Sequence, residues 1–182
     1  FFKTLVNGAT VLDVFSLVGG FGRAARAAGA AAVTCVDSSV PALDLAQRGA
    51  DATDGAGTFA CVKSDAFGAL QDFGADGQSF DCVVCDPPAF APSKQALEPG
   101  LRAYERVARL AAPLVSQDGI LVLCSCSHAA TLEKFRAACV RGIGRSGRSA
   151  QLIHTGEAGP DHPKHIMLAE TGYLKSLFFR VF

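Results

Sequence analysis

The chain has 182 residues, of which 49% are hydrophobic and 19 are glycine, and its 17 basic side chains balance 17 acidic ones. This length and composition suit one globular domain with a substantial buried core. The zero net charge excludes a global positive field that would attract nucleic acid, so such binding needs a local patch. No apolar run approaches the roughly 20 residues of a membrane helix and no cleavable leader is visible, so we expect a cytoplasmic protein without membrane contact.

Strand-like and helix-like patterns alternate along the chain. Apolar runs predict strands over residues 10–15, 33–37, 58–63, 82–85, 119–126, 150–154 and 174–181. Helical spacing and helix-start signals predict helices over residues 21–28, 38–48, 65–73, 98–116 and 129–140. The predicted loops include residues 49–57 and the basic, glycine-rich residues 141–149. Five successive βα units require right-handed crossovers, so we predict a doubly wound α/β fold with a mostly parallel, seven-stranded, Rossmann-like sheet whose last strand is antiparallel.

The seven cysteines are odd in number and mostly lie in apolar runs, which favours reduced thiols over a disulfide framework. Cys82 and Cys85 form a C-x-x-C pair on a predicted strand, where residues three apart face opposite sides. They therefore cannot bind one zinc ion together, and the four histidines have no metal-ligand spacing. We expect no metal site.

The predicted strand over residues 82–85 stops at Asp86, which Pro87 and Pro88 follow. Proline can neither extend a central strand nor donate to its ladder, so the acid is fixed at the strand's carboxyl end. Ligands of open α/β sheets bind at that edge. A carboxylate on a stiff turn there is a candidate for holding a substrate.

A glycine-rich turn over residues 16–22 follows the first predicted strand. Such a turn brings bare backbone close to a ligand at a helix N-terminus. Residues 20–25 also satisfy the loose G-x-G-x-x-A form of the dinucleotide fingerprint, with Asp37 as its downstream acid. A dinucleotide-binding domain of NAD type therefore stays open as an alternative at this point.

Acids occur in order at or near the ends of the first four predicted strands: Asp13, Asp37, Asp65 and Asp86. This order resembles the class I S-adenosylmethionine-dependent methyltransferases. The resemblance implies that the loop after the first strand wraps the amino-acid part of S-adenosyl-L-methionine, that Asp37 takes the ribose hydroxyls and that Asp65 reaches the adenine amine. Carboxylates suit both tasks because they accept hydrogen bonds. The implied cofactor-binding residues are Asp13, Phe15, Ser16, Gly19, Gly20, Asp37, Ser38, Asp65, Ala66 and Asp86. The alternative for Asp37 is a helix-terminal acid, and for Asp65 a helix N-cap.

Two further motifs indicate which kind of molecule receives the methyl group. Residues 86–90 (DPPAF), with Lys94, and residues 124–127 (CSCS) resemble the ribosomal RNA 5-methylcytosine methyltransferases of the bacterial large-subunit type. The resemblance extends to Tyr104, to residues 161–163 (DHP) and to residues 172–175 (GYLK). It implies ribosomal RNA as the partner. Because that family carries an additional N-terminal RNA-binding domain and this chain begins at Phe1, we expect residues 1–182 to be the catalytic domain alone.

The resemblance makes Cys126 the nucleophile, and the chemistry supports that role. Carbon 5 of cytosine cannot attack a sulfonium methyl group directly, so a thiolate must first add at carbon 6. An ordinary thiol, with a pKa of about 8.5, is only slightly ionised at neutral pH, so the site must assist. Asp86 is the predicted catalytic partner, holding the ring nitrogen and the exocyclic amine. Cys124, on the same strand but deeper in it, is the alternative nucleophile, and inert packing of both thiols is another.

The remaining acceptor-side residues are assigned by the same resemblance: Pro87, Pro88, Phe90 and Lys94. Lys94 is interpreted as a phosphate contact, with a solvated loop lysine as the alternative. The base that removes the carbon 5 proton stays open between Asp86, Lys94 and a water molecule. Arg141, Arg145 and Arg148 are a candidate phosphate patch, with a solvated loop as the alternative.

Ala89 occupies the position where another group of 5-methylcytosine enzymes has a second cysteine, so the chain resembles the single-cysteine type. Exocyclic-amine methyltransferases place an aromatic ring directly after the prolines, and Phe90 lies one residue too late for that pattern. Three functions remain as alternatives. They are a ribosomal RNA guanine methyltransferase, an NAD-type oxidoreductase and an inactive RNA-binding module.

Overall fold

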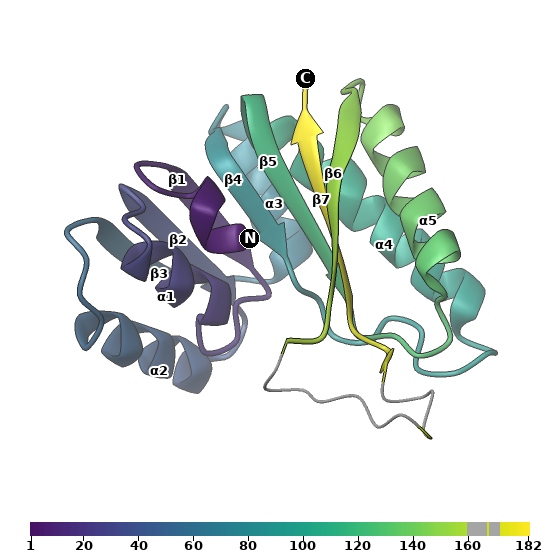
Figure 1. The fold of residues 1–182 in the computed structure, drawn as a ribbon, viewed down its shortest axis with the longest axis horizontal. Helices are drawn as coiled ribbons and strands as arrows, with labels where there is room; N and C mark the ends of the chain where they lie inside the picture. Colours follow the sequence, from purple (N-terminus) through teal and green to yellow (C-terminus); the bar gives the residue numbers. More distant parts are fainter. Residues whose placement is uncertain (160–166, 168–171) are drawn as a thin grey trace.

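The computed structural model describes residues 1–159, 167 and 172–182 (Figure 1). Its centre is a seven-stranded sheet in the order β3-β2-β1-β4-β5-β7-β6. The strands are β1 (Thr10–Val14), β2 (Ala32–Asp37), β3 (Thr58–Lys63), β4 (Phe80–Cys85), β5 (Val115–Ser125), β6 (Ala150–Glu157) and β7 (Lys175–Val181). β1 to β5 pair in parallel, and β7 is antiparallel to both of its neighbours. The predicted fold class is confirmed.

Helices cover both faces of the sheet. They are α1 (Gly20–Ala27), α2 (Val40–Asp51), α3 (Ala66–Ala75), α4 (Leu97–Ala111) and α5 (Leu132–Arg145), with short 3-10 turns at Phe2–Leu5 and Ala112–Leu114. Two separate clusters of buried side chains fill the two interfaces. Val83 and Cys85 lie in the cluster with α3 to α5, whereas Cys82 and Val84 lie in the cluster with α1 and α2. The C-x-x-C thiols therefore face opposite sides of β4, as predicted.

The prediction of a basic loop over residues 141–149 is wrong, because α5 continues to Arg145. Arg141 and Arg145 both pair with Glu105 of α4, so they belong to a helix–helix contact. Arg148 donates instead to the carbonyl oxygens of Phe182 and Val115. Glycine disfavours helices locally, but close packing between α4 and α5 overrides that preference here.

Three other predicted boundaries need correction. α2 extends into the predicted loop and ends at Asp51. α4 ends at Ala111, five residues before the prediction, because β5 begins early at Val115. β5 ends at Ser125, so Cys126 lies directly after the strand rather than within it. Residues 161–163, one of the motifs that carry the resemblance, lie outside the described residues.

The part of the chain that the structure describes contains no helix long and apolar enough to cross a membrane. Within the same residues, no group of three or more His, Cys, Asp or Glu side chains is arranged to hold a metal ion.

Gly142 tests the contact between α4 and α5. A Cβ atom at this position would collide with the Glu105 carbonyl and lie 2.7 Å from Ala108 Cβ. We expect Gly142→Ala to lower the free energy of unfolding by about 1–3 kcal/mol, as overpacking does. Gly144→Ala, in the same helix but with open space around its Cβ, should raise it by up to about 1 kcal/mol. Urea unfolding of both variants measures the difference, and equal effects would contradict the packing argument.

Candidate active site

The loop after β1 has an unusual backbone. Phe15, Leu17 and Gly19 have positive φ angles of 61°, 47° and 72°. Such angles are rare for large side chains and persist where surrounding structure enforces them, often at functional sites. The enforcing contacts come from β2, because the Ser16 amide donates to the Val36 carbonyl at 3.0 Å. The loop is thus held at the carboxyl edge of the sheet.

Asp13 anchors the helix that follows this loop. Its side chain is 1% exposed, and its Oδ2 accepts from the Gly22 amide at 2.8 Å. Burial raises the pKa of the Asp13 carboxyl to about 7, against the opposing effect of the Gly22 hydrogen bond. A side chain at Gly22 would meet Cys35 Sγ, so glycine permits the close approach of α1 to β2. Asp13 Oδ1 is buried and has no hydrogen-bond partner among the described residues.

Asp37 and Asp65 end β2 and follow β3. Asp37 accepts from the Leu17 amide at 2.8 Å and from the Ser39 amide at 2.9 Å, and so ties the loop after β1 to the start of α2. Asp65 is the N-cap of α3 and accepts from the Gly68 amide at 2.9 Å. Asp37 therefore does contact the start of a helix, and Asp65 does act as an N-cap, as the structural alternatives for these two residues predict. Each carboxylate keeps further acceptor capacity for a ligand.

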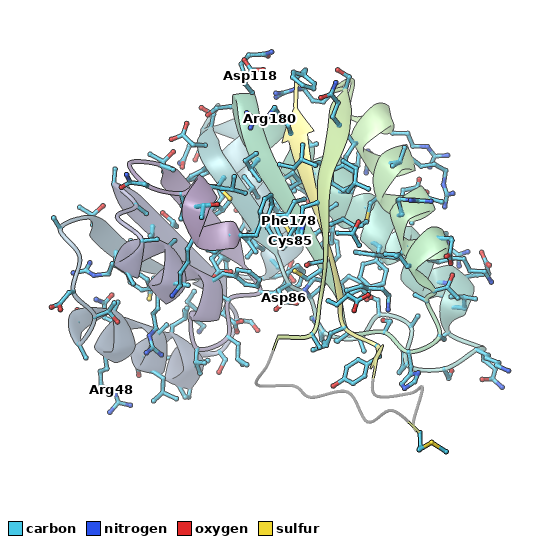
Figure 2. All side chains as sticks on the ribbon, in the orientation of Figure 1. Arg48, Cys85, Asp86, Asp118, Phe178 and Arg180 are labelled. Atoms are coloured by element: carbon cyan, nitrogen blue, oxygen red, sulfur yellow. The ribbon has the colours of Figure 1, made fainter. Side chains whose placement is uncertain are left out.

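The ends of β4 and β5 meet at Pro87 and Cys126. The Cys126 thiol lies 3.8 Å from the Pro87 carbonyl oxygen, to which it donates. Asp86 marks the carboxyl edge of the sheet, opposite the edge that carries Asp118 and Arg180 (Figure 2). Asp86 is exposed on a concave surface, and partial desolvation by the surrounding protein raises the pKa of its carboxyl.

A cavity of about 520 Å³ lies along this edge. Its walls are Phe15, Leu17, Asp37, Ser38, Asp65, Ala66, Asp86, Pro87, Pro88, Cys126 and Leu174. A smaller hollow of about 210 Å³ shares Phe15, Leu17 and Asp86 with it, and its other walls include Asp13, Ser16 and Gly20. Every predicted cofactor residue except Gly19, a buried turn residue, therefore lines one of these two adjoining spaces.

Two of the predicted substrate residues lie elsewhere. Phe90 packs in an aromatic cluster, with ring centroids 6.2 Å from Phe67 and 5.0 Å from Tyr104. Lys94 is exposed in the segment between β4 and α4 and does not line the cavity. Pro87 and Pro88 do line it. The structure therefore brings Pro87, Pro88 and Cys126 together but sets Phe90 and Lys94 apart from them.

The two cysteines of residues 124–127 differ in environment. Cys124 is 7% exposed and packs in the core on the α1 and α2 side of the sheet. Cys126 is only partly buried and lines the cavity beside Asp86. Burial raises the pKa of both thiols, and the nearby Asp86 charge raises them further. Only Cys126 is placed to reach a ligand in the cavity.

A buried hydroxyl network holds the Cys126 segment. Tyr104 OH lies 2.7 Å from Ser127 Oγ and accepts from Ser125 Oγ at 2.9 Å. Ser127 Oγ also accepts from the Ala91 amide at 2.9 Å, which joins the loops after β4 and β5. Sequence reasoning missed this network, although the polar Tyr104 among apolar helix positions is a signal that could have indicated it.

Lys175 is a second residue that sequence reasoning left without a role. Its Nζ donates to the Ser127 carbonyl at 3.0 Å and to the Tyr173 carbonyl at 2.8 Å. The antiparallel pairing of β5 and β7 places Lys175 opposite Ser125. Local sequence signals do not reveal this pairing, which depends on the order of the strands.

The strand order, with acids at the carboxyl ends of β1 to β4, defines the Rossmann-like methyltransferase fold. Residues 1–140 match the family model described as "Conserved hypothetical protein 95", and the chain belongs to this family.

Ribosomal RNA large subunit methyltransferase I of Escherichia coli is 33% identical over 180 residues, which are 98% of this chain and 46% of that protein. The Ribosomal RNA large subunit methyltransferase of Deinococcus radiodurans is 34% identical over 178 residues, which are 97% of this chain and 43% of that protein. The chain thus spans less than half the length of these two relatives.

Solved structures share the fold. SMU.776, a candidate methyltransferase solved in complex with SAH, superposes with a TM-score of 0.82 at 22% identity, over 98% of this chain and 47% of that chain. NSun6 from Pyrococcus horikoshii, solved with SFG, superposes with a TM-score of 0.70 at 16% identity, over 98% of this chain and 49% of that chain. At these identities the superpositions show the fold alone.

The raised pKa of Asp13 makes stability depend on pH. Between pH 4 and 7 the folded state binds a proton at Asp13 that the unfolded state has released, so stability falls as pH rises through this window. The side chain introduced by Asp13→Asn cannot ionise, so the variant does not lose stability in this way. From pH 5 to pH 8 its free energy of unfolding should therefore rise relative to that of the wild type by on the order of 3 kcal/mol. Urea unfolding at both pH values measures this gap, with Asp72→Asn on the exposed side of α3 as control. An unchanged gap would contradict the assignment.

Proposed function

We propose that this chain is the catalytic domain of an S-adenosylmethionine-dependent RNA methyltransferase that forms 5-methylcytosine in ribosomal RNA through a covalent adduct with Cys126. The observation that supports this proposal most directly is that Cys126 and Asp86 line the same cavity as Asp37 and Asp65. A nucleophile for the acceptor and carboxylates for a nucleoside thus share one space. The names of the relatives support ribosomal RNA as the substrate.

The residues of the site fit S-adenosyl-L-methionine. Asp37 and Asp65 lie at the ends of adjacent strands and can accept from ribose hydroxyls and from an adenine amine. Asp13 lines the smaller hollow, and its Oδ1, buried without a partner among the described residues, suits a polar group of the amino-acid part. When bound, this cofactor supplies an electrophilic methyl group on a sulfonium.

The protein's own residues perform the chemistry on the base. Cys126 Sγ forms a bond to carbon 6 of cytosine, and the electron pair of the carbon 5–carbon 6 double bond moves to carbon 5. Asp86 in its protonated form, which burial favours, donates to the ring nitrogen and accepts from the exocyclic amine. Carbon 5 then accepts the methyl group. The Asp86 carboxylate or a water molecule accepts the carbon 5 proton, and the double bond re-forms as the Cys126–carbon 6 bond breaks and the thiolate leaves.

The surface between α4 and α5 is a candidate contact for RNA phosphates. A shallow hollow there is lined by Arg102, Glu105, Arg106, Arg109 and Arg145. Four guanidinium groups around one carboxylate give a local positive field in a chain of zero net charge. The Arg106 guanidinium also lies 4.5 Å above the Phe67 ring, which packs against Phe15 of the cavity wall. Arg106 therefore links the lining of this hollow to the aromatic side chains that pack behind the cavity wall.

The dinucleotide alternative is disfavoured by topology. The usual dinucleotide-binding order, 3-2-1-4-5-6, has its last strand next to the fifth. Here the antiparallel β7 lies between β5 and β6. The glycine fingerprint has a structural explanation as well, because Gly22 is required by the contact with Cys35.

Cofactor choice is tested by isothermal titration. We expect S-adenosyl-L-methionine to bind and NADH not to bind. Asp37→Asn should weaken the binding by about 5- to 100-fold, because a charged, half-buried acceptor for hydroxyls is lost at a cost of about 1–3 kcal/mol. Asp44→Asn on the exposed side of α2 is the matched control. Tight binding of NADH without binding of S-adenosyl-L-methionine would refute the proposed function.

Cys126 and Cys124 provide a matched pair for the covalent step. Cys126→Ala should lower cytosine methylation by more than about 100-fold, because the nucleophile is lost. Cys124→Ala should keep activity and cost only about 1 kcal/mol of stability, as small core truncations do. Methylation is measured by mass mapping of ribosomal RNA, with cofactor affinity as the folding check.

RNA containing 5-fluorocytidine should trap a denaturation-resistant adduct with the wild type and with Cys124→Ala, but not with Cys126→Ala. The trap works because fluorine at carbon 5 cannot leave as a proton. Full methylation of cytosine by Cys126→Ala would remove this thiol as nucleophile. A methylated guanine in the mapped RNA would instead identify the guanine methyltransferase.

A further inference from the structure

The ammonium group of Lys175 is fixed beside the segment that carries Cys126. Its two hydrogen bonds, to the carbonyl oxygens of Ser127 and Tyr173, hold Nζ at the residue directly after the thiol. Lys175 is the first residue of β7 and pairs in register with Ser125, the residue directly before the thiol. The lysine is thus tied to the residues directly before and directly after Cys126.

The bonding of this ammonium leaves room for an anion. A lysine has three N–H donors, and two of them are directed to neutral carbonyl oxygens here. No ion pair joins Lys175 to an acidic side chain within the described residues. A half-buried ammonium without a carboxylate partner favours an anion nearby. The Cys126 thiolate, which the reaction requires, is such an anion.

We propose that Lys175 is a positioning residue that stabilises the thiolate form of Cys126 and holds the Ser125–Ser127 turn, so that Sγ is presented to the base in the cavity. This inference rests on the proposed covalent role of Cys126. It assigns a function to the first residue of β7, which directly follows Leu174 of the cavity wall.

The charges around Cys126 agree with this role. Burial and the charge of Asp86, which follows β4, raise the pKa of the Cys126 thiol, whereas Lys175 lowers it. Burial in turn lowers the pKa of the Lys175 ammonium, and the thiolate counteracts that effect. Tyr104 of α4, whose own pKa is raised chiefly by burial, interacts with the same thiol.

Two more ionisable groups lie near the lysine. Glu157 of β6 pairs in register with Lys175, and His128 follows Cys126 by two residues. The carboxylate of Asp86, directly after β4, is the charge that opposes ionisation of the Cys126 thiol. Protonation of Asp86, which the hydrogen bond to the cytosine ring requires, removes that opposition, so that burial is then the effect that Lys175 counteracts at the Cys126 thiol.

The test is the ionisation of Cys126 itself. Wild type, Lys175→Met and Lys175→Arg are alkylated with iodoacetamide over a range of pH, and the Cys126 peptide is quantified by mass spectrometry. Lys175→Met removes the charge with a side chain of similar length, so the midpoint should rise by about one pH unit and alkylation below it should slow about tenfold. Lys175→Arg keeps the charge and should stay close to the wild type.

The acid limb of the pH profile of kcat/KM for RNA should move in the same direction as the alkylation midpoint in Lys175→Met. A merely structural lysine would lower activity without moving either pH dependence, and that result would overturn the inference. So would an unchanged midpoint in Lys175→Met with normal activity. The alkylation measurement needs no methyl transfer. If Cys126→Ala stays active, the covalent mechanism fails, but the alkylation midpoint still decides whether Lys175 controls the thiol.

Discussion

The hydroxyl of Ser127 joins the segments on which the acceptor side of the site depends. It accepts from the Ala91 amide of the loop after β4 and bonds to Tyr104 of α4, while its own residue follows Cys126. A buried hydroxyl network of this kind is stabilising only when its members are satisfied, and loss of one member leaves the others unpaired in a dry environment. The relative positions of Asp86 and Cys126 therefore depend on a few buried hydrogen bonds.

The carboxyl edge of the sheet gathers several acids, and their mutual effects organise the rest of the site. Asp13 is raised in pKa first by burial and then also by the charges of Asp86 and Asp37. Such a cluster is unfavourable in the protein alone, because like charges meet in a partly dry space. Hydrogen bonds to backbone amides offset part of this cost at Asp13 and Asp37. A cationic ligand would offset more, which is consistent with a sulfonium cofactor.

Much of the fold and site could be predicted from the sequence because the signals are local. Asp86 is followed by two prolines, Asp37 ends an apolar run, and in a parallel sheet the ends of neighbouring strands meet at one edge. These rules are sufficient to bring the acids and Cys126 to one cavity. They were not sufficient for Phe90, whose ring packs beside α4 instead of lining the site. They also failed at residues 141–149, where packing of α5 against α4 overrides the loop preference of glycine.

The sequence predicts that the last strand is antiparallel, but local signals do not show which residue this direction brings to the site. An antiparallel strand begins where its neighbour ends, so the first residue of β7 arrives at the carboxyl edge of β5. A parallel strand in the same place would begin at the opposite edge, where Asp118 lies (Figure 2). Lys175 can therefore reach the turn that carries Cys126 only because β7 runs against the rest of the sheet. The same reversal that separates this fold from a dinucleotide-binding domain thus supplies a cation to the thiol, from a part of the chain almost 50 residues away.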